Sequence, residues 1–324
     1  MRAATCVLVL IGLLVSAALS LAQPVASLKR IGILSEDSAR LSKVEETLRE
    51  SFRELGYIEG KTIAFDYRSA SRGAGDVGSV ARELVQSGVD LVFAIGTPSA
   101  LAMSKASSSV PIVFVVADPV GIGLVASLAR PGGNATGVAS LAAESGAKRL
   151  ELLREALPHA TRIAVLANPN NASTGLQLRE LESVARNFGF KLRVLNVSRA
   201  EDLDEAFAVI RRERLDALVT APDAILNGHL AAIAKRALKI KLPGIAGARV
   251  FADSGGLMSF GPNYTALWRR CAVYADKILK GTKPAELPVE QAATFELVIN
   301  LRTADTLGLR FPQSFLLRAD EVIR

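Results

Sequence analysis

The sequence predicts an α/β protein built from two doubly wound, Rossmann-like lobes. From Lys29 onward, short aliphatic runs alternate with amphipathic runs, which is typical of parallel strands covered by helices. A strand-like run that starts at Arg30 is echoed by a similar run that starts at Arg162. Half of the 324 residues are hydrophobic but only 5% are aromatic, a composition that favours buried parallel strands over an all-β sandwich.

The first half of the chain contains four predicted strands. Each is a short, nearly continuous apolar run, as expected for a parallel sheet that is covered on both faces. These runs are residues 30–34, 62–67, 90–95 and 111–116. The helix between the first two opens with a capping box, Ser42 and Glu45, and Gly56 closes it. A second helix is expected over residues 76–86.

The second half repeats this order and then departs from it. Strands are expected at 162–166, 191–197, 216–220 and 242–246, and helices at 201–212 and 224–238. A glycine-flanked strand at 255–261, a strong helix at 262–280, a strand at 295–300 and a short final helix follow. These additions indicate that neither lobe is one uninterrupted segment. The chain is therefore expected to cross between the lobes several times.

Residues 1–22 are predicted to be a secretory signal peptide. Arg2 precedes an apolar run from Val7 to Leu19, and small residues up to Ala22 form a cleavage site. The alternative is a membrane anchor, but the apolar run is short for a bilayer span. Because no later apolar run is long enough to cross a membrane, stable membrane insertion is not expected.

Composition and charge argue against several classes of protein. Two Cys and two His leave little material for a disulfide scaffold or a metal site, so no metal is expected. The 39 basic and 32 acidic residues are interspersed, which is typical of solvated helix faces and argues against binding of nucleic acid. Cys271 lies on the apolar stripe of its predicted helix and is expected to be a buried thiol.

One glycine-rich segment matches a cofactor motif. Residues 121–126 fit the dinucleotide pattern G-x-G-x-x-A. However, the segment follows the fourth predicted strand, whereas the dinucleotide motif follows the first. The sequence also contains no P-loop, no G-x-S-x-G elbow and no nucleophile–base pair in these loops. We therefore expect no cofactor and no catalytic residues.

The loop of residues 96–99 is the strongest candidate for binding a solute. It follows the third predicted strand, and ligands of open parallel sheets bind beyond the carboxyl ends of the strands. Gly96 permits close backbone approach, and Thr97 is expected to be the N-cap, with Pro98 at the first position of the next helix. The free N–H groups, with the hydroxyls of Thr97 and Ser99, then favour an anion such as a carboxylate. The same residues would equally make an ordinary helix cap.

Polar residues follow other predicted strands too, and most have two interpretations. Ser35 follows the first strand of lobe 1. Asp118 follows the fourth, where it either pairs with a ligand amine or caps a helix after Pro119. In lobe 2, Asn168 and Asn170 hydrogen-bond a ligand or serve as turn residues. Asp223 follows the third strand of that lobe.

Nine longer motifs extend the pattern over essentially the whole chain after residue 22. They are residues 52–60, 96–98, 118–120, 127–137, 148–153, 255–261, 277–281, 287–291 and 295–300. Together they resemble the ABC-transporter substrate-binding proteins of the tryptophan/tyrosine-type permease group. Phe260 stands in the sixth motif where relatives often carry Tyr. Its ring either faces the ligand-binding cleft between the lobes and affects the choice of ligand, or packs at the hinge that joins the lobes.

The resemblance implies a type I periplasmic-binding-protein fold, in which a three-crossover hinge joins the lobes. Lobe 1 would comprise residues 29–136 and 256–283, and lobe 2 residues 140–247 and 290–324, with crossovers near 134–141, 246–256 and 284–295.

The resemblance also implies a function. The protein would be a periplasmic, monomeric receptor that binds a small solute in the interlobe cleft and delivers it to an inner-membrane ABC permease. Aromatic amino acids are the favoured solutes, held by the carboxylate in lobe 1 while lobe 2 closes as a clamshell. Two other functions fit the same architecture: a ligand sensor for a membrane signalling receptor, and an enzyme that works across the cleft.

Overall fold

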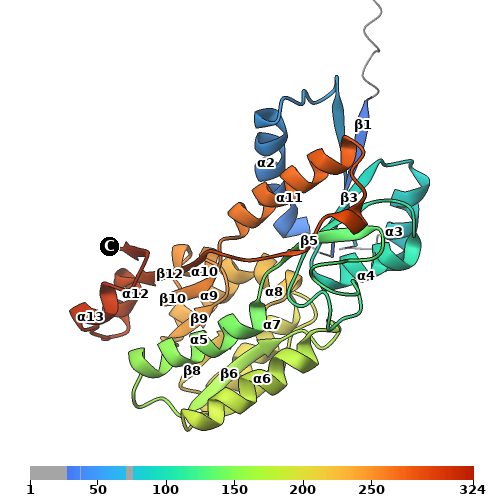
Figure 1. The fold of residues 1–324 in the computed structure, drawn as a ribbon. Helices are drawn as coiled ribbons and strands as arrows, with labels where there is room; N and C mark the ends of the chain where they lie inside the picture. Colours follow the sequence, from blue (N-terminus) through green and yellow to red (C-terminus); the bar gives the residue numbers. More distant parts are fainter. Residues whose placement is uncertain (1–27, 37, 71–75) are drawn as a thin grey trace, which may run out of the picture.

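The computed structural model describes residues 28–324 except 37 and 71–75, and within this part the chain forms two α/β lobes (Figure 1). The signal peptide expected at residues 1–22 lies outside the described residues. Each lobe is built around its own sheet.

Lobe 1 contains a parallel six-stranded sheet. In spatial order its strands are β11 (Glu290–Gln291), β5 (Ala135–Ala139), β4 (Ile112–Val116), β3 (Leu91–Ile95), β1 (Lys29–Ser35) and β2 (Ile63–Ser69). Its helices are α2 (Ser38–Glu54), α3 (Val77–Gln86), α4 (Thr97–Ala106) and α11 (Tyr264–Leu279), with a 3₁₀ turn η1 (Pro284–Glu286). Helices α2 and α11 pack together, and α3 packs on α4.

Lobe 2 contains a seven-stranded sheet in which β10 and β12 run antiparallel and the other neighbours run parallel. In spatial order its strands are β13 (Glu321–Ile323), β12 (Phe295–Asn300), β10 (Met258–Pro262), β9 (Gly244–Ala246), β8 (Ala217–Thr220), β6 (Arg162–Ala167) and β7 (Lys191–Asn196). Its helices are α5 (Ala142–Ala156), α6 (Thr174–Asn187), α7 (Asp202–Glu213), α8 (Ala224–Gly228), α9 (Leu230–Lys239), α10 (Val250–Asp253), α12 (Leu301–Thr306) and α13 (Gln313–Leu316).

Both faces of each sheet are covered, which explains the continuously apolar strands. In β1, Ile31 and Ile33 join the core beneath α2 and α11, whereas Leu34 joins the core beneath α3 and α4. Alternate side chains of a strand point to opposite faces, so a strand buried on both sides needs apolar residues throughout. The doubly wound α/β prediction is confirmed. Cys271 is also buried as predicted, and burial raises the pKa of its thiol.

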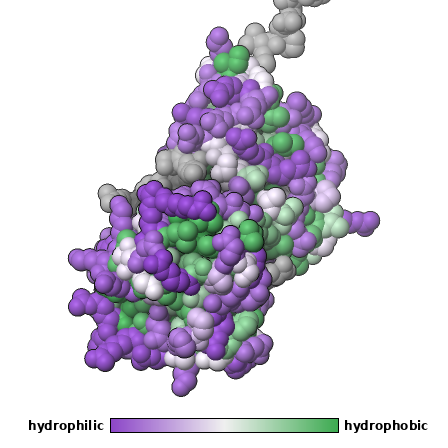
Figure 2. All heavy atoms as spheres, turned by 90° about the vertical axis from the view of Figure 1, so that its left-hand side faces the viewer, coloured by the Kyte–Doolittle hydropathy of each residue, from purple (hydrophilic) through white to green (hydrophobic). Residues whose placement is uncertain are grey.

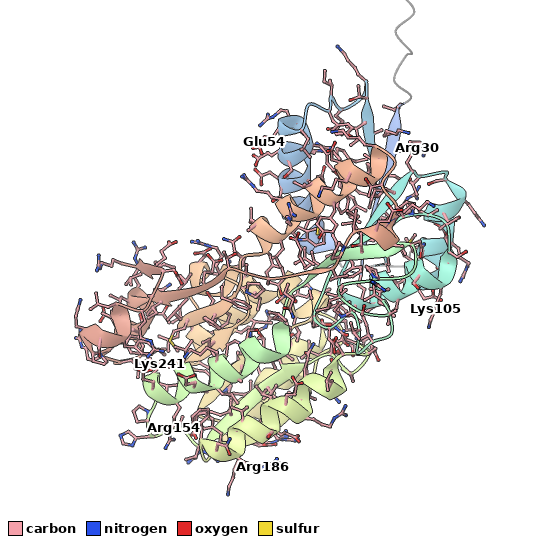
Figure 3. All side chains as sticks on the ribbon, viewed as in Figure 1. Arg30, Glu54, Lys105, Arg154, Arg186 and Lys241 are labelled. Carbon is pink, nitrogen blue, oxygen red and sulfur yellow. The ribbon has the colours of Figure 1, made fainter. Side chains whose placement is uncertain are left out.

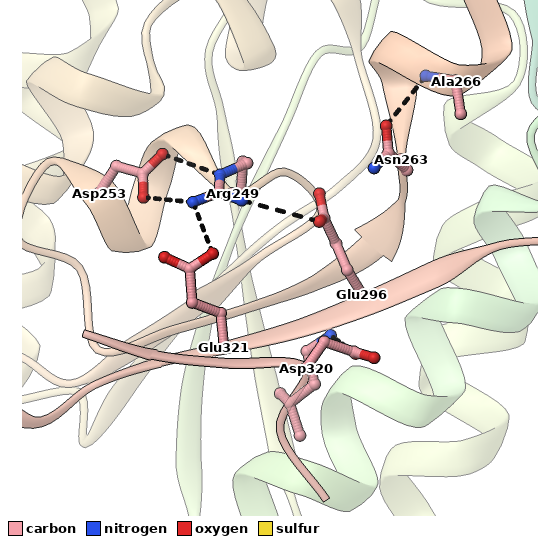
Figure 4. A network of polar contacts seen from close by, with 8 residues as sticks. Arg249, Asp253, Asn263, Ala266, Glu296, Asp320 and Glu321 are labelled. Carbon is pink, nitrogen blue, oxygen red and sulfur yellow. Dashed lines mark hydrogen bonds and ion pairs between the residues drawn. The ribbon is translucent and has the colours of Figure 1, made fainter.

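The chain crosses between the lobes at three places. The first crossing runs from β5 to α5 through Leu141, whose φ of 50° is left-handed, an unusual conformation for a bulky residue. The second runs from β10 to α11 through Asn263, and the third runs from β11 to β12 through residues 292–294. The side chain of Asn263 caps α11 by accepting the N–H of Ala266 at 2.9 Å (Figure 4).

The second crossing lies later than the sequence suggested. We expected it near 246–256, with 256–283 in lobe 1, but residues 258–262 form β10 of lobe 2. There Met258 pairs with Ile245 of β9 and with Ile299 of β12, so this apolar strand fills the place between them. Helix α11, which also belongs to the segment 256–283, packs on lobe 1 as expected.

The third boundary also shifts slightly. Lobe 2 was expected to resume at residue 290, whereas β11, residues 290–291, still pairs with β5 of lobe 1. The chain therefore returns to lobe 2 only when β12 begins at Phe295.

Charged side chains cover the outside of both lobes. Arg30, Lys105, Arg186 and Lys241 are exposed and lie in separate parts of the chain (Figure 3). The face drawn in Figure 2 is largely hydrophilic, with smaller hydrophobic areas between the charged side chains. These basic residues are scattered, as predicted for solvated faces.

Candidate functional site

A small cavity lies between the lobes, at the carboxyl ends of their parallel strands. Its volume is about 30 Å³, room for about one or two water molecules. Both lobes line it, with Gly96, Thr97, Val115, Val116, Ala117 and Ser140 from lobe 1, Asn171, Ser173, Pro222, Asp223, Ala224 and Asn227 from lobe 2, and Tyr264 at the start of α11. This is the position at which open α/β sheets bind ligands.

The wall in lobe 1 is the N-terminus of α4. The N-cap residue is Gly96 and not Thr97 as expected, so no side chain caps this helix. Pro98 has no N–H, and the N–H groups of Thr97 and Ser99 have no partner within the helix because they lie in its first turn. Backbone donors and the helix dipole therefore give this wall a partial positive charge. Ser99 is fully buried, and its hydroxyl has no hydrogen-bond partner within the described part of the chain.

The lobes approach each other closely beside this helix. Gly96 has a φ of +84°, and a Cβ atom at this position would lie 3.0 Å from the Cβ of Ala224 in α8. Only glycine adopts this backbone conformation without strain, and only glycine leaves room for the opposite lobe. Helix α2 of lobe 1 also contacts α8.

The wall in lobe 2 centres on the carboxylate of Asp223, which is 4% exposed. Its Oδ2 accepts the side-chain amides of Asn168 at 3.1 Å and Asn171 at 2.9 Å. Its Oδ1 accepts the backbone N–H of Leu226 at 3.0 Å, which caps α8. These three donors are neutral, and no Lys or Arg of the described residues forms an ion pair with this carboxylate.

A second layer of hydrogen bonds holds those amides in place. The Oδ1 of Asn168 accepts the backbone N–H of Asn170 at 3.0 Å. The Oδ1 of Asn171 accepts the hydroxyl of Ser173 at 2.9 Å, and that hydroxyl accepts the amide of Gln177, also at 2.9 Å. Each Asn thus donates to Asp223 in a fixed orientation.

Three of the site residues expected from the sequence line the cavity: Gly96, Thr97 and Asp223. Asn168 is buried behind Asp223, and Asn170 is exposed and forms the turn that orients Asn168. The structure places the remaining residues of lobe 1 away from the lining: Ser35 and Ser99 are buried, and Pro98 and Asp118 are half-buried.

Asp118 and Phe260 both have structural roles, although Asp118 closes a turn and does not cap the helix expected after Pro119. The Oδ1 of Asp118 accepts the N–H of Gly121 at 2.8 Å and so closes a turn. The ring of Phe260 stacks on Phe295, with centroids 5.9 Å apart and planes at 16°. Since Phe295 begins β12 directly after the third crossing, Phe260 packs at the hinge.

Sequence reasoning missed several lining residues. Asn171 belongs to the same loop as Asn168 and Asn170, and the Asn-rich pattern could have included it. Ser140 follows β5, which lay within an expected crossover and was not recognised as a strand. Tyr264 follows the second crossing, which was expected earlier. Ser140 and Tyr264 both lie just after a strand, which is the signal that could have identified them. The misplaced crossings between the lobes obscured it.

Arg149 is a second buried charge, located behind the cavity. It is 1% exposed, and its Nη1 donates to the hydroxyl of Ser145 at 3.1 Å and to the carbonyl of Phe260 at 3.3 Å. Burial lowers the pKa of its guanidinium to about 10. Arg149 therefore ties α5 to β10 beside the hinge, and it is not among the lining residues.

A larger groove, of about 780 Å³, shares Asn227 and Tyr264 with the cavity. Its walls come from α2, α11, α8 and the segment that includes Arg249. Arg249 contacts Asp253 at 3.1 Å, Glu321 at 3.0 Å and Glu296 at 3.9 Å (Figure 4). Burial raises the pKa of Glu296.

The described residues contain neither a metal-binding cluster nor a membrane-spanning helix. Within residues 28–324, less the gaps at 37 and 71–75, no group of three His, Cys, Asp or Glu is arranged to hold a metal ion. In the same residues, no helix is both long and apolar enough to cross a membrane.

Known proteins resemble this chain over most of its length. The model of the ABC transporter substrate binding protein family matches residues 31–323. A tyrosine-binding protein of Clostridioides difficile (strain R20291) is 28% identical over 284 residues, which are 87% of this chain and 81% of that protein.

Three solved structures share the fold over at least nine-tenths of this chain. A conserved domain protein of Vibrio cholerae is 30% identical with a TM-score of 0.84, covering 91% of this chain and 99% of that chain. An ABC domain from Streptococcus pneumonia in complex with L-Trp is 26% identical with a TM-score of 0.80, covering 92% and 100%. The ligand-free, open structure of a substrate binding protein with adhesive properties from Clostridium difficile is 28% identical with a TM-score of 0.62, covering 91% and 99%.

The family match spans nearly all of the described residues, and the two-lobed fold agrees with these structures. The chain therefore belongs to the ABC transporter substrate binding protein family, which is a family of binding proteins and not of enzymes.

Proposed function

We propose that this protein is an extracytoplasmic receptor of an ABC uptake transporter. It binds a small solute in the interlobe cavity and delivers it to the inner-membrane permease. One observation carries the proposal: in a chain of this family, a helix N-terminus of lobe 1 faces a buried carboxylate of lobe 2 across one cavity. Export by cleavage of residues 1–22 is part of the proposal, because the cavity must meet its solute outside the cytoplasm.

The solute in this proposal is an amino acid, with aromatic side chains favoured. A relative named a tyrosine-binding protein and a relative solved with L-Trp support this class. In lobe 1 the solute's carboxylate accepts hydrogen bonds from the first turn of α4 and from the hydroxyl of Thr97. The groove beside Tyr264 and Trp268 provides space for a large side chain.

Solute binding in this proposal closes the lobes. A cavity of about 30 Å³ is far smaller than the roughly 300–1,000 Å³ of typical ligand pockets, so the lobes must separate to admit a solute. The higher TM-score to the L-Trp complex, 0.80 against 0.62 for the ligand-free, open relative, supports a closed arrangement here. A solute that touches both walls binds the closed state more tightly and so shifts the population toward it.

A thermal-shift screen of ligand-stripped protein tests the ligand class. The panel contains the amino acids, simple carboxylates, nucleosides and sugars. A solute at about 100 times its Kd adds roughly 2.7 kcal/mol of stability, which raises the Tm by several degrees. We expect a rise with L-Trp or L-Tyr. A rise with sugars or nucleosides alone would contradict the amino-acid assignment.

ATP hydrolysis by the reconstituted transporter tests the uptake role. The solute-loaded receptor is expected to stimulate hydrolysis more than the receptor without solute. No stimulation by the loaded receptor would contradict transport and favour the sensor alternative.

A further inference from the structure

Asp223 differs from Asp276, the other buried acid of the described chain. Both are buried, at 4% and 8% exposure. Asp276 has a cation beside it, because Lys280 lies 2.8 Å from its carboxylate. Asp223 receives only neutral donors, the amides of Asn168 and Asn171 and one backbone N–H. Within the described residues its negative charge therefore has no counter-ion.

This arrangement fits a binding group better than a purely structural one. Burial of a charge without a counter-ion is costly, and the cap of α8 by itself requires only a neutral acceptor. Asp223 also faces the cavity. The second layer of hydrogen bonds, through Asn170 and Ser173, holds its carboxylate in place before any solute arrives. A preorganised charge of this kind favours a ligand cation.

The opposite wall has the opposite polarity. The N-terminus of α4 presents N–H groups and the positive end of the helix dipole to the same cavity. The two walls come into contact where Gly96 meets Ala224, the residue next to Asp223. A positive pole and a negative pole thus face each other across a short gap. This pair of charges is complementary to the carboxylate and the ammonium group of a zwitterion.

We propose that Asp223 binds the ammonium group of the solute and thereby restricts the site to α-amino acids, excluding the corresponding simple acids. This inference rests on the proposed function. Asp118, the other candidate for the ammonium group, closes a turn through Gly121 and does not line the cavity. Because each pole belongs to a different lobe, a solute with both charges bridges the lobes and stabilises their closure.

Calorimetric titration of the wild-type protein tests the inference first. The probes are L-Trp, indole-3-propionate, which lacks the amine, and N-acetyl-L-tryptophan, whose nitrogen is neutral. We expect L-Trp to bind at least about 30-fold more tightly than either analogue. Equal affinity for L-Trp and indole-3-propionate would overturn the role of Asp223 and leave the receptor function intact. Absence of binding by every amino acid would instead overturn the proposed ligand class, and the inference with it.

The variant Asp223→Asn then assigns the effect to this residue. Asn keeps the size and an acceptor for Leu226, so the cap of α8 is retained. We expect affinity for L-Trp to fall about 30-fold or more and affinity for indole-3-propionate to stay the same or rise. Unchanged preference for L-Trp in this variant would overturn the inference. Asp118→Asn is the matched control, since it also removes a carboxylate that accepts one backbone N–H, and it should bind L-Trp like the wild type.

Discussion

The two walls of the interlobe cavity present different kinds of polar group. In lobe 1 the polar groups are mainly backbone N–H groups at the start of α4, positioned by Gly96 and Pro98. In lobe 2 they belong to side chains, because Asp223 is held by two asparagines that are themselves held by neighbours. The lobe 1 wall therefore depends on backbone conformation, whereas the lobe 2 wall depends on the identity of several side chains.

This difference determines which substitutions matter in each lobe. A side-chain deletion in lobe 1 removes a hydroxyl but leaves the N–H groups of the helix in place. A side-chain deletion in lobe 2 removes a donor to a buried carboxylate and disturbs the group that faces the solute. Backbone changes should show the reverse order, with the larger effect in lobe 1.

Among substitutions other than Asp223→Asn, the largest effect is expected for Gly96→Val. A side chain here meets Ala224 of the opposite lobe, and overpacking of this kind costs about 1–3 kcal/mol, so affinity for L-Trp should fall about 10- to 100-fold. Calorimetric titration measures the loss. Gly60→Val is the control, because Gly60 also has a positive φ, +79°, but nothing lies within 4 Å of its Cβ position. Equal loss of affinity in both variants would show that the contact between the lobes does not matter.

A smaller loss is expected for Asn171→Ala. This variant removes the 2.9 Å hydrogen bond to Asp223, and hydrogen bonds to charged groups contribute about 1.5–3 kcal/mol. Affinity for L-Trp should fall about tenfold. Affinity for indole-3-propionate should fall less, since that probe has no ammonium group. Equal losses for both probes would indicate a general disturbance of the wall.

The double variant Thr97→Ala, Ser99→Ala should lose less again. Only Thr97 lines the cavity, and the N–H groups of α4 still bind the solute's carboxylate when the hydroxyl is removed, so we expect a loss of about 3- to 10-fold in titrations with L-Trp. Undiminished affinity would show that the Thr97 hydroxyl does not bind the carboxylate of the solute. A loss larger than that of Asn171→Ala would contradict the contrast between the two walls.

The smallest effect is expected outside both walls, at Glu290 beside the third crossing. Arg270 donates to its carboxylate at 2.7 Å and lowers its pKa. A lowered carboxyl pKa stabilises the fold above the unfolded-state value and loses that contribution as the pH falls through the folded-state value. Glu290→Gln should therefore lower the stability at neutral pH by at most about 1 kcal/mol, since the pair is partly exposed. Urea denaturation should show the difference shrinking below about pH 4, while affinity for L-Trp stays unchanged.

The fold was largely predictable from the sequence, because strands buried on both faces need continuous apolar runs. The exception was the strand around Met258. Its pattern identified a strand, but the choice of sheet depended on its neighbours Ile245 and Ile299, which lie far away in the sequence.

The site was predictable only in part. The rule that ligands bind after the strand ends found Gly96, Thr97 and Asp223. It could not distinguish Asn168 from Asn171, because the side chain that lines the cavity depends on the turn between them. It also missed Tyr264, since the crossing before this residue was misplaced. The stacking of Phe260 on Phe295 required knowledge of two strands that pair across the sheet.

Small-angle X-ray scattering with and without solute tests the central claim most directly. If the cavity between Gly96 and Asp223 closes on an amino acid, saturating L-Trp should reduce the radius of gyration of the ligand-stripped protein. The scattering curve of the loaded protein should then match the structure described here. An unchanged curve at a concentration where calorimetry shows saturation would contradict closure of the two walls on the solute.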